Sequence, residues 1–261
     1  MSFLFDVPLI IMAPLIVLVL MGLAQLGLEI FRRRMLPGLQ FGHSDAHFSG
    51  AMLASIMVFY GLAMALIAVH VWVTYEDVAT ITSHEATSLA ALYRDVSEYP
   101  EPPRTELQAG LREYTNYVIH EAWPQQHRGQ VPGGGVARMD RFQATLMAFE
   151  PRTEGQKLLA GETLRAYNIN VEARRMRLDA VEVHLPGVLW LIIVIGAIVS
   201  VVSAYYFPVV DPRIHRVQVA LLTMFIGLVI FLVLALDRPF RGDLGLPSTP
   251  YQLVYDHLMA R

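Results

Sequence analysis

Residues 183–210 read VHLPGVLWLIIVIGAIVSVVSAYYFPVV, a stretch that contains no Asp, Glu, Lys or Arg. A helix rises about 1.5 Å per residue, so roughly 20 apolar residues cross the ~30 Å hydrocarbon layer of a bilayer. Three more stretches share this length and this lack of charge: Val7–Leu28, Ala46–Tyr75 and Val217–Leu236. Inside a bilayer, only helices and closed barrels satisfy every backbone polar group. The sequence therefore predicts an all-α integral membrane protein with four transmembrane helices.

The composition of the whole chain agrees with this fold class and excludes several kinds of site. Hydrophobic residues make up 54% of the sequence and charged residues 16%, well below the roughly 25% charged residues of soluble proteins. The net charge of −3 argues against a nucleic-acid partner, which requires a basic surface. The chain has no cysteine, so disulfides, thiolate catalysis and cysteine-held metal clusters are excluded. We expect no cofactor.

Charged residues concentrate in one long insert and divide the chain into four parts. Residues 1–73 hold the first two spans and an arginine-rich connector, and residues 74–185 form a water-exposed domain. Residues 186–236 hold spans three and four, and residues 237–261 form a C-terminal tail. Within the insert, apolar residues recur every third or fourth position, as on one face of a helix. We therefore predict an extramembrane bundle of four helices, whose first and last helices extend spans two and three.

Arginines near the ends of the spans indicate which side of the membrane the bundle faces. Arg32, Arg33 and Arg34 follow the first span, and Arg213 and Arg216 lie between spans three and four. Positively charged connectors stay in the cytoplasm, and the first span usually dominates. These residues predict that the bundle lies on the outer face of the membrane. Basic residues near span ends on the opposite side argue against this orientation: Arg174, Arg175, Arg177, Arg238 and Arg241.

Three charged residues of the insert stand where its helical pattern requires apolar side chains, namely Glu85, Glu121 and Arg174. A buried charge is costly unless it is paired and hydrogen-bonded. One arginine between two carboxylates satisfies all three groups, so we predict that they form one buried polar network. A structural ion network is the simpler interpretation, and an ion relay or gate is the functional alternative.

Histidines next to these two carboxylates raise the question of a metal site. His84 directly precedes Glu85, and His120 directly precedes Glu121. Carboxylate-bridged metal bundles use Glu-x-x-His instead, because that spacing puts both ligands on one helical face. Adjacent residues point about 100° apart on a helix, so this spacing argues against a metal centre.

A second pair of histidines, His43 and His47, lies in the connector before span two. Residues four apart share a face when the chain is helical, so this pair has the spacing of metal ligands. The interpretation that we favour is a helix N-cap at Ser44 or Asp45 with both histidines exposed. We predict no metal site in this chain.

Span two carries the most polar side of the four spans. By the helical period, four of its residues fall on one stripe: Tyr60, Ile67, His70 and Thr74. Ionisable residues inside a membrane usually face a bundle interior or a water-filled path. This stripe is therefore our candidate for a pore lining. His70 fits an interfacial position equally well, because aromatic residues such as Trp72 mark the membrane boundary.

A second stripe on span two consists of small residues: Gly50, Ala54, Gly61 and Ala68. Small side chains let two membrane helices approach closely. We predict that this stripe packs against another helix.

No sequence pattern points to catalysis. A nucleophile with its base, a phosphate loop and a dinucleotide fingerprint are all missing from the sequence. The glycine run 133–135 lacks the Lys-Ser/Thr that follows in a phosphate loop. An enzyme is the least supported class.

Five segments lie in order over most of the chain: HEATSLAALYR (84–94), YVIHEAWP (117–124), RRMRL (174–178), LPGVLW (185–190) and LDRPFRG (236–242). Together they resemble the bestrophin-like domain family of bacterial and plant membrane proteins. They include Glu85, Glu121 and Arg174, which the helical pattern singles out independently. The resemblance implies four spans with a helical domain between spans two and three.

By its name, the family also implies a distant relation to the bestrophin anion channels, which are pentamers whose second span lines the pore. This chain departs from them in two ways. Bestrophins carry an aromatic-rich hydrophobic neck in span two, where this chain offers only Phe59 and Tyr60. Their helical domain is cytoplasmic, which is opposite to the orientation that the arginines predict.

Two functions remain open on these grounds. The first is a homo-oligomeric ion channel that arranges span two around a wet axis, with Glu85 near the mouth of the pore. The second is a non-conducting scaffold or accessory subunit of a larger membrane complex, which uses the bundle as a docking module. In both cases we expect contact with membrane lipid and a location in the bacterial inner membrane.

Overall fold

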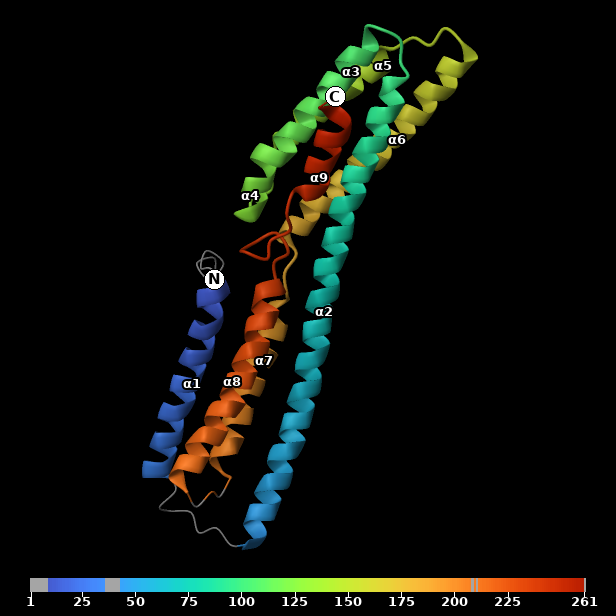
Figure 1. The fold of residues 1–261 in the computed structure, drawn as a ribbon. Coiled ribbons are helices and arrows are strands. Elements are labelled where there is room, and N and C mark those ends of the chain that lie inside the picture. Colours follow the sequence, from blue (N-terminus) through green and yellow to red (C-terminus); the bar gives the residue numbers. More distant parts are fainter. Residues whose placement is uncertain (1–8, 36–42, 208, 210, 261) are drawn as a thin grey trace. The chain divides into compact units, whose positions relative to one another are not determined.

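The computed structural model describes residues 9–35, 43–207, 209 and 211–260, and every regular element among them is helical (Figure 1). The all-α class is therefore confirmed for these residues. Contacts divide the chain into two compact units. The membrane unit comprises Met1–Val73 and His184–Asp237, and the bundle unit comprises Thr74–Val183 and Arg238–Arg261. Each unit is built from two separate parts of the sequence.

Four helices make up the membrane unit. They are α1 (Leu9–Arg34), the first part of α2 (His43–Ser97), α7 (Gly187–Tyr205) and α8 (Pro212–Leu236). All four are long and apolar enough to cross a membrane. Their outward surfaces consist largely of exposed Ile, Leu and Val side chains, as lipid contact requires. The chain is therefore a multi-pass membrane protein.

Helices α1 and α8 form the most extensive helix pair of the membrane unit. Their backbones approach at Gly227, where an added Cβ would lie 3.3 Å from the Cα of Val17. Lipid is as apolar as the side chains, so membrane helices associate through close packing rather than through the hydrophobic effect. A residue without a side chain at this point allows that packing.

The ends of the later spans follow from local sequence. Pro186 precedes α7, and the backbone N–H of Leu185 donates a hydrogen bond to Oδ1 of Asp237 at the end of α8 (2.6 Å). Helix α8 starts with Pro212, and the Asp211 side chain accepts a hydrogen bond from the Arg213 N–H (2.7 Å). Proline at the first helical position and an aspartate cap are both typical helix starts.

The bundle unit contains the remainder of α2 and eight further helical elements among the described residues. They are α3 (Pro103–Tyr117), a π-helical segment η3 (Val118–Ala122), α4 (Trp123–His127), α5 (Gly135–Ala148), α6 (Glu154–Asp179), η4 (Ala180–Glu182), α9 (Thr249–Val254) and η5 (Tyr255–Met259). Thr153 caps α6 by accepting a hydrogen bond from the Gln156 N–H. One hydrophobic core joins these helices, and Leu89, Leu107 and Leu111 are fully buried in it.

The C-terminal segment belongs to this core. The Tyr251 side chain of α9 is fully buried, and so is that of Met259. Nε1 of Trp123 donates to the Leu246 carbonyl (2.8 Å), and Nε of Arg112 donates to the Met259 carbonyl (2.8 Å). Residues 238–260 therefore complete the bundle unit.

The first and last helices of the insert differ in how they connect to the spans. Helix α2 runs without a break from His43 to Ser97, as predicted. Helix α6 ends at Asp179, and η4 and an extended Val183 separate it from Gly187, where α7 begins. Pro186 explains this difference, because proline lacks an N–H and disfavours a helical residue before it. The prediction that the last helix runs directly into span three is therefore wrong.

Candidate functional site

A buried ion pair lies in the interior of the bundle unit. Glu85 of α2 and Arg177 of α6 are 0% and 1% exposed, so water does not reach either charge. Nε of Arg177 donates to Oε2 of Glu85 (2.6 Å), and Nη2 donates to Oε1 (3.2 Å). The hydroxyl of Tyr114 also donates to Oε1 (2.8 Å). This two-pronged geometry is the arrangement in which a buried charge pair is best satisfied.

Aromatic rings cover the rest of the guanidinium. The Arg177 Cζ lies 5.7 Å from the ring centroid of Trp123 and 5.7 Å from that of Tyr251. Nη1 of Arg177 has no hydrogen-bond partner in the described part of the chain. Cation–π attraction to two rings offsets part of the cost of removing that nitrogen from water.

The electrostatics of this cluster act on the pKa values of Arg177, Tyr114 and Tyr251. Burial alone would lower the pKa of Arg177, but the Glu85 carboxylate outweighs burial and holds this pKa well above its usual value. Burial, together with the nearby Glu85 charge, raises the pKa of Tyr114 above its usual range. Burial also raises the pKa of Tyr251 well above its ordinary value. Arg177 therefore stays protonated and both phenols stay neutral near neutral pH.

A polar seam continues the cluster along the α2–α6 contact. Nδ2 of Asn170 donates to Oγ of Ser88 (2.9 Å) and to the Glu85 carbonyl (3.3 Å). Both Asn170 and Glu85 are fully buried, and Ser88 is 8% exposed. Side chains from two helices thus fix the register of α6 against α2. These buried bonds have a structural role, because they hold α2 and α6 together.

The predicted three-membered network is only partly right. Glu85 is buried and paired as predicted, but its partner is Arg177, one turn beyond Arg174. Arg174 is 8% exposed, and its guanidinium lies beside Gly135 at the start of α5. No ion pair joins Arg174 to Glu85 or to Glu121 among the described residues.

The prediction that Glu121 is buried is wrong, and the local helix geometry gives the reason. Its side chain is 59% exposed, and its only ion pair among the described residues is a long contact of 3.9 Å with Arg138. The helix passes through the π-helical segment Val118–Ala122 at this point. A π turn takes in an extra residue, so the buried face continues at Ala122 and Trp123, and Glu121 turns to the surface.

The four residues of the predicted pore stripe on α2 differ in their exposure. Tyr60 and Ile67 are 9% and 7% exposed, because they face the interior of the membrane unit. The Tyr60 hydroxyl donates to the Ile193 carbonyl of α7 (3.3 Å), and its ring lies against Gly196. His70 is exposed and Thr74 is partly exposed. Tyr60 therefore contacts α7 of its own chain, and the pore lining stays a prediction.

The small-residue stripe of α2 is largely uncovered within the chain. Ala54 and Gly61 are exposed, and a Cβ added at Gly61 would meet no atom within 4 Å. Gly50 and Ala68 are partly covered, and Gly50 lies near the ring of Phe207. Close approaches occur instead at glycines that the sequence reasoning did not single out: Gly27, Gly196 and Gly227. A glycine opposite an aromatic residue on another span is the signal that could have found the first two.

Metal ligands do not gather in the described residues, where no group of three His, Asp or Glu side chains could hold an ion. His84 and His120 make no such group with the carboxylates that follow them. The side chains of His43 and His47, together with Ser44 and Asp45, lie outside the described residues. The predicted helix N-cap at Ser44 or Asp45, with both histidines exposed, therefore stays a prediction.

These features define a class of protein: a multi-pass helical membrane protein with an additional helical bundle that is locked by a buried ion pair. A family model of the bestrophin-like domain matches residues 19–251. The chain belongs to the bestrophin-like domain family. No curated protein and no solved structure matches the chain.

Proposed function

We propose that the protein is a homo-oligomeric ion channel of the bestrophin-like type, whose copies meet along the small-residue side of α2. One observation carries the proposal. Among the described residues, the membrane part of α2 is buried on one face, at Tyr60, Met64, Ile67 and Val71. Its small-residue side, including Gly61, is open within the chain. Small residues on an uncovered membrane helix fit a neighbouring helix better than they fit lipid.

The face of α2 opposite the buried one is the proposed pore wall. Its residues recur at alternating spacings of four and three and are all exposed: Ala51, Ser55, Val58, Leu62, Ala65 and Val69. This face carries no charge, and the Ser55 hydroxyl donates to the Ala51 carbonyl of its own helix (2.9 Å). A ring of such helices would form an apolar constriction, which gates ions by excluding water.

Particle symmetry and assembly test the oligomer. We expect purified full-length protein to form rings with rotational symmetry. Gly61→Ile should shift these particles toward single chains, because the added side chain blocks the helix contact. Gly22→Ile on α1 is the matched control, since an added Cβ there also meets no atom within 4 Å. Equal assembly of the two variants would contradict the proposed contact.

Planar-bilayer recording tests conduction. Leu62→Ser should raise the current by wetting the constriction, whereas Leu18→Ser on α1 should not. The two leucines are comparably exposed, at 59% and 64%. Absence of current in the wild type and in Leu62→Ser, at any ion composition or pH, would refute the channel. Particles without a central axis that carry other subunits would instead support the scaffold function.

For orientation, the arginines in the last turn of α1 support placing the bundle unit on the outer face of the bacterial inner membrane. The chain has no cysteine, so one introduced cysteine gives a unique label. Gly133→Cys should react with a membrane-impermeant maleimide in intact cells, and Arg213→Cys should react only after lysis. The reverse result would place the bundle in the cytoplasm, as in bestrophins.

A further inference from the structure

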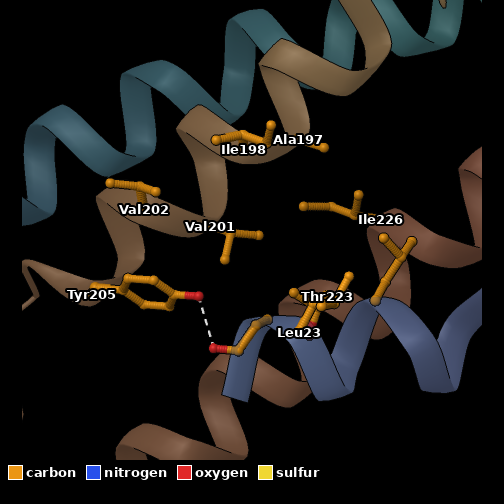
Figure 2. A pocket seen from close by; sticks show the side chains of 10 residues that line it. Leu23, Ala197, Ile198, Val201, Val202, Tyr205, Thr223 and Ile226 are labelled. Atoms are coloured by element: carbon orange, nitrogen blue, oxygen red, sulfur yellow. Dashed lines mark hydrogen bonds between the residues drawn. The ribbon is translucent and has the colours of Figure 1, made fainter. Parts of the chain in front are cut away.

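An apolar groove of about 220 Å³ opens between α1, α7 and α8 of the membrane unit (Figure 2). Its rim is lipid-facing: Leu23, Ile198 and Val202 are 62%, 56% and 42% exposed. Its floor is buried and includes Ala24, Tyr205 and Thr223. The groove is therefore a recess in the surface that faces the acyl chains of the bilayer.

The two polar side chains of the floor are already satisfied. The Tyr205 hydroxyl donates to the Ala24 carbonyl (2.7 Å), which is the dashed line in Figure 2. The Thr223 hydroxyl donates to the Val219 carbonyl of its own helix (2.6 Å). With no free donor or acceptor from these two groups, the groove favours a hydrocarbon chain over a polar ligand.

Positive charge gathers at one end of the same helices. Helix α1 ends with Arg32, Arg33 and Arg34. Arg216 of α8 joins them, because its Nη2 contacts Oε2 of Glu29 (3.4 Å) and its carbonyl accepts a hydrogen bond from Gln25 (2.9 Å). Arg33 and Arg216 both pair with Glu29, at 2.8 Å and 3.4 Å. Four arginines against one glutamate leave this end of the membrane unit positively charged, so it attracts an anion.

The arginines and the groove are spaced as the two parts of one lipid. Leu23 lies ten residues before Arg33, which corresponds to about 15 Å along the helix. Half of the ~30 Å hydrocarbon layer is the same distance. An acyl chain whose headgroup lies at the arginines therefore reaches the groove within its own leaflet.

One donor at the charged end lacks a partner. Nη1 of Arg32 is shielded from solvent and has no hydrogen-bond partner in the described part of the chain. A guanidinium nitrogen can only donate, and a phosphate oxygen is a strong acceptor for it. An anionic headgroup would satisfy this nitrogen, whereas a zwitterionic one would also bring its own cation toward the arginines.

We infer that the membrane unit holds one anionic phospholipid, with an acyl chain in the groove and its phosphate at Arg32, Arg34 and Arg216. Native mass spectrometry of the full-length protein, titrated in detergent with phosphatidylglycerol or phosphatidylcholine, tests this site. We expect one phosphatidylglycerol per chain, bound about tenfold more tightly than phosphatidylcholine, since each basic residue near a membrane surface adds attraction to anionic lipid.

Two pairs of variants separate the parts of the site. The double variant Arg32→Gln/Arg34→Gln should abolish the preference for phosphatidylglycerol, and the control Arg141→Gln/Arg152→Gln, in the bundle unit, should keep it. Val202→Phe places a ring in the groove and should weaken binding of both lipids several-fold. Val199→Phe adds the same ring to α7 outside the groove, at a residue of equal exposure (43% against 42%).

Several results would overturn the site. Equal binding of the two lipids by the wild type would contradict selection of an anionic headgroup. Equal lipid affinity of Val202→Phe and Val199→Phe would contradict binding of an acyl chain in the groove. If Val202→Phe does not fold, a second measurement tests the proposal. It compares how much phosphatidylglycerol raises the melting temperature of the wild type and of Arg32→Gln/Arg34→Gln. The same stabilisation in both would refute the proposal.

Discussion

The two units satisfy their buried polar groups in different ways. In the membrane unit, three bonds between helices end on backbone carbonyls: Tyr60 binds the Ile193 carbonyl, Tyr205 that of Ala24, and His215 that of Ala204. In the bundle unit, some buried side chains also donate to backbone carbonyls, as Trp123 does to that of Leu246, but others pair with side chains, as in Glu85 with Arg177 and Asn170 with Ser88. Lipid supplies no hydrophobic drive between helices, so close contact decides packing there. Water supplies that drive for the bundle, whose apolar core can surround a costly charge pair.

The largest expected effect comes from breaking the charge pair in the bundle unit. Glu85→Gln leaves Arg177 buried without a counter-charge, so the free energy of unfolding should fall by about 3–5 kcal/mol. Replacing both residues, as Glu85→Leu/Arg177→Met, should restore most of this loss. Chemical denaturation of the detergent-solubilised protein measures both. Glu121→Gln, on an exposed carboxylate, is the control and should change stability by less than about 0.5 kcal/mol.

In the membrane unit, close backbone packing is the feature to attack. Gly227→Ile should lower stability by about 1–3 kcal/mol, because its Cβ would press on the backbone of Val17. Gly22→Ile, where the added Cβ meets no atom within 4 Å, should be nearly neutral. Thermal unfolding in detergent compares the two. Equal melting temperatures would mean that α1 and α8 do not depend on this contact.

Alkaline pH should act on the bundle unit through its buried tyrosines. The folded-state pKa of Tyr114 and that of Tyr251 are raised above the unfolded value of about 10. Protonated phenol is therefore favoured in the folded state, so this stability is fully present below pH ~10 and is lost as the pH rises. Each tyrosine removes up to about 1.4 kcal/mol per pH unit above 10. In Tyr114→Phe, unfolding measured from pH 8 to 11 should show a shallower loss; an unchanged slope would contradict this.

Neutral hydrogen bonds compare the two units directly, and the bond in the membrane unit should give the smallest effect. Asn170→Ala removes two bonds in the bundle interior and should cost about 1–3 kcal/mol, because the Ser88 hydroxyl and the Glu85 carbonyl lose a partner. Tyr60→Phe removes one bond in the membrane unit and should cost about 0.6 kcal/mol. Denaturation of both variants under one set of conditions tests the ratio. A larger loss for Tyr60→Phe would reverse the comparison between the units.

Sequence alone predicts the fold class well, because uncharged length is a strong signal for membrane spans. It also predicts that Glu85 is buried, since a carboxylate replaces an apolar residue in a regular stripe. The partner of Glu85 is harder to find. The central buried stripe of α6 contains Thr163, Asn170 and Arg177, and Leu164 and Leu178 lie beside it. The apolar residues Leu164 and Leu178 each lie one position after a residue of the buried stripe. Apolar periodicity therefore does not identify the polar residues that face α2.

The prediction that Glu121 is buried fails for a different reason. Periodicity assumes one helical pitch throughout, and the π-helical segment Val118–Ala122 shifts the register by a residue. The stripe on span two is ambiguous for a third reason, because a polar stripe marks any buried face. Tyr60 faces α7 of its own chain, and the sequence does not distinguish an internal neighbour from a second copy.

The placement of Tyr251 on Arg177 has a consequence for biosynthesis. The bundle unit needs Arg238–Arg261, yet this segment leaves the ribosome after α7 and α8 have emerged. Until then, one aromatic wall of the guanidinium is missing, although residues 74–183 are already complete. Closure of the bundle is thus coupled to insertion of the last two spans, and a nascent chain that stalls before residue 251 presents its charged interior to chaperones and proteases.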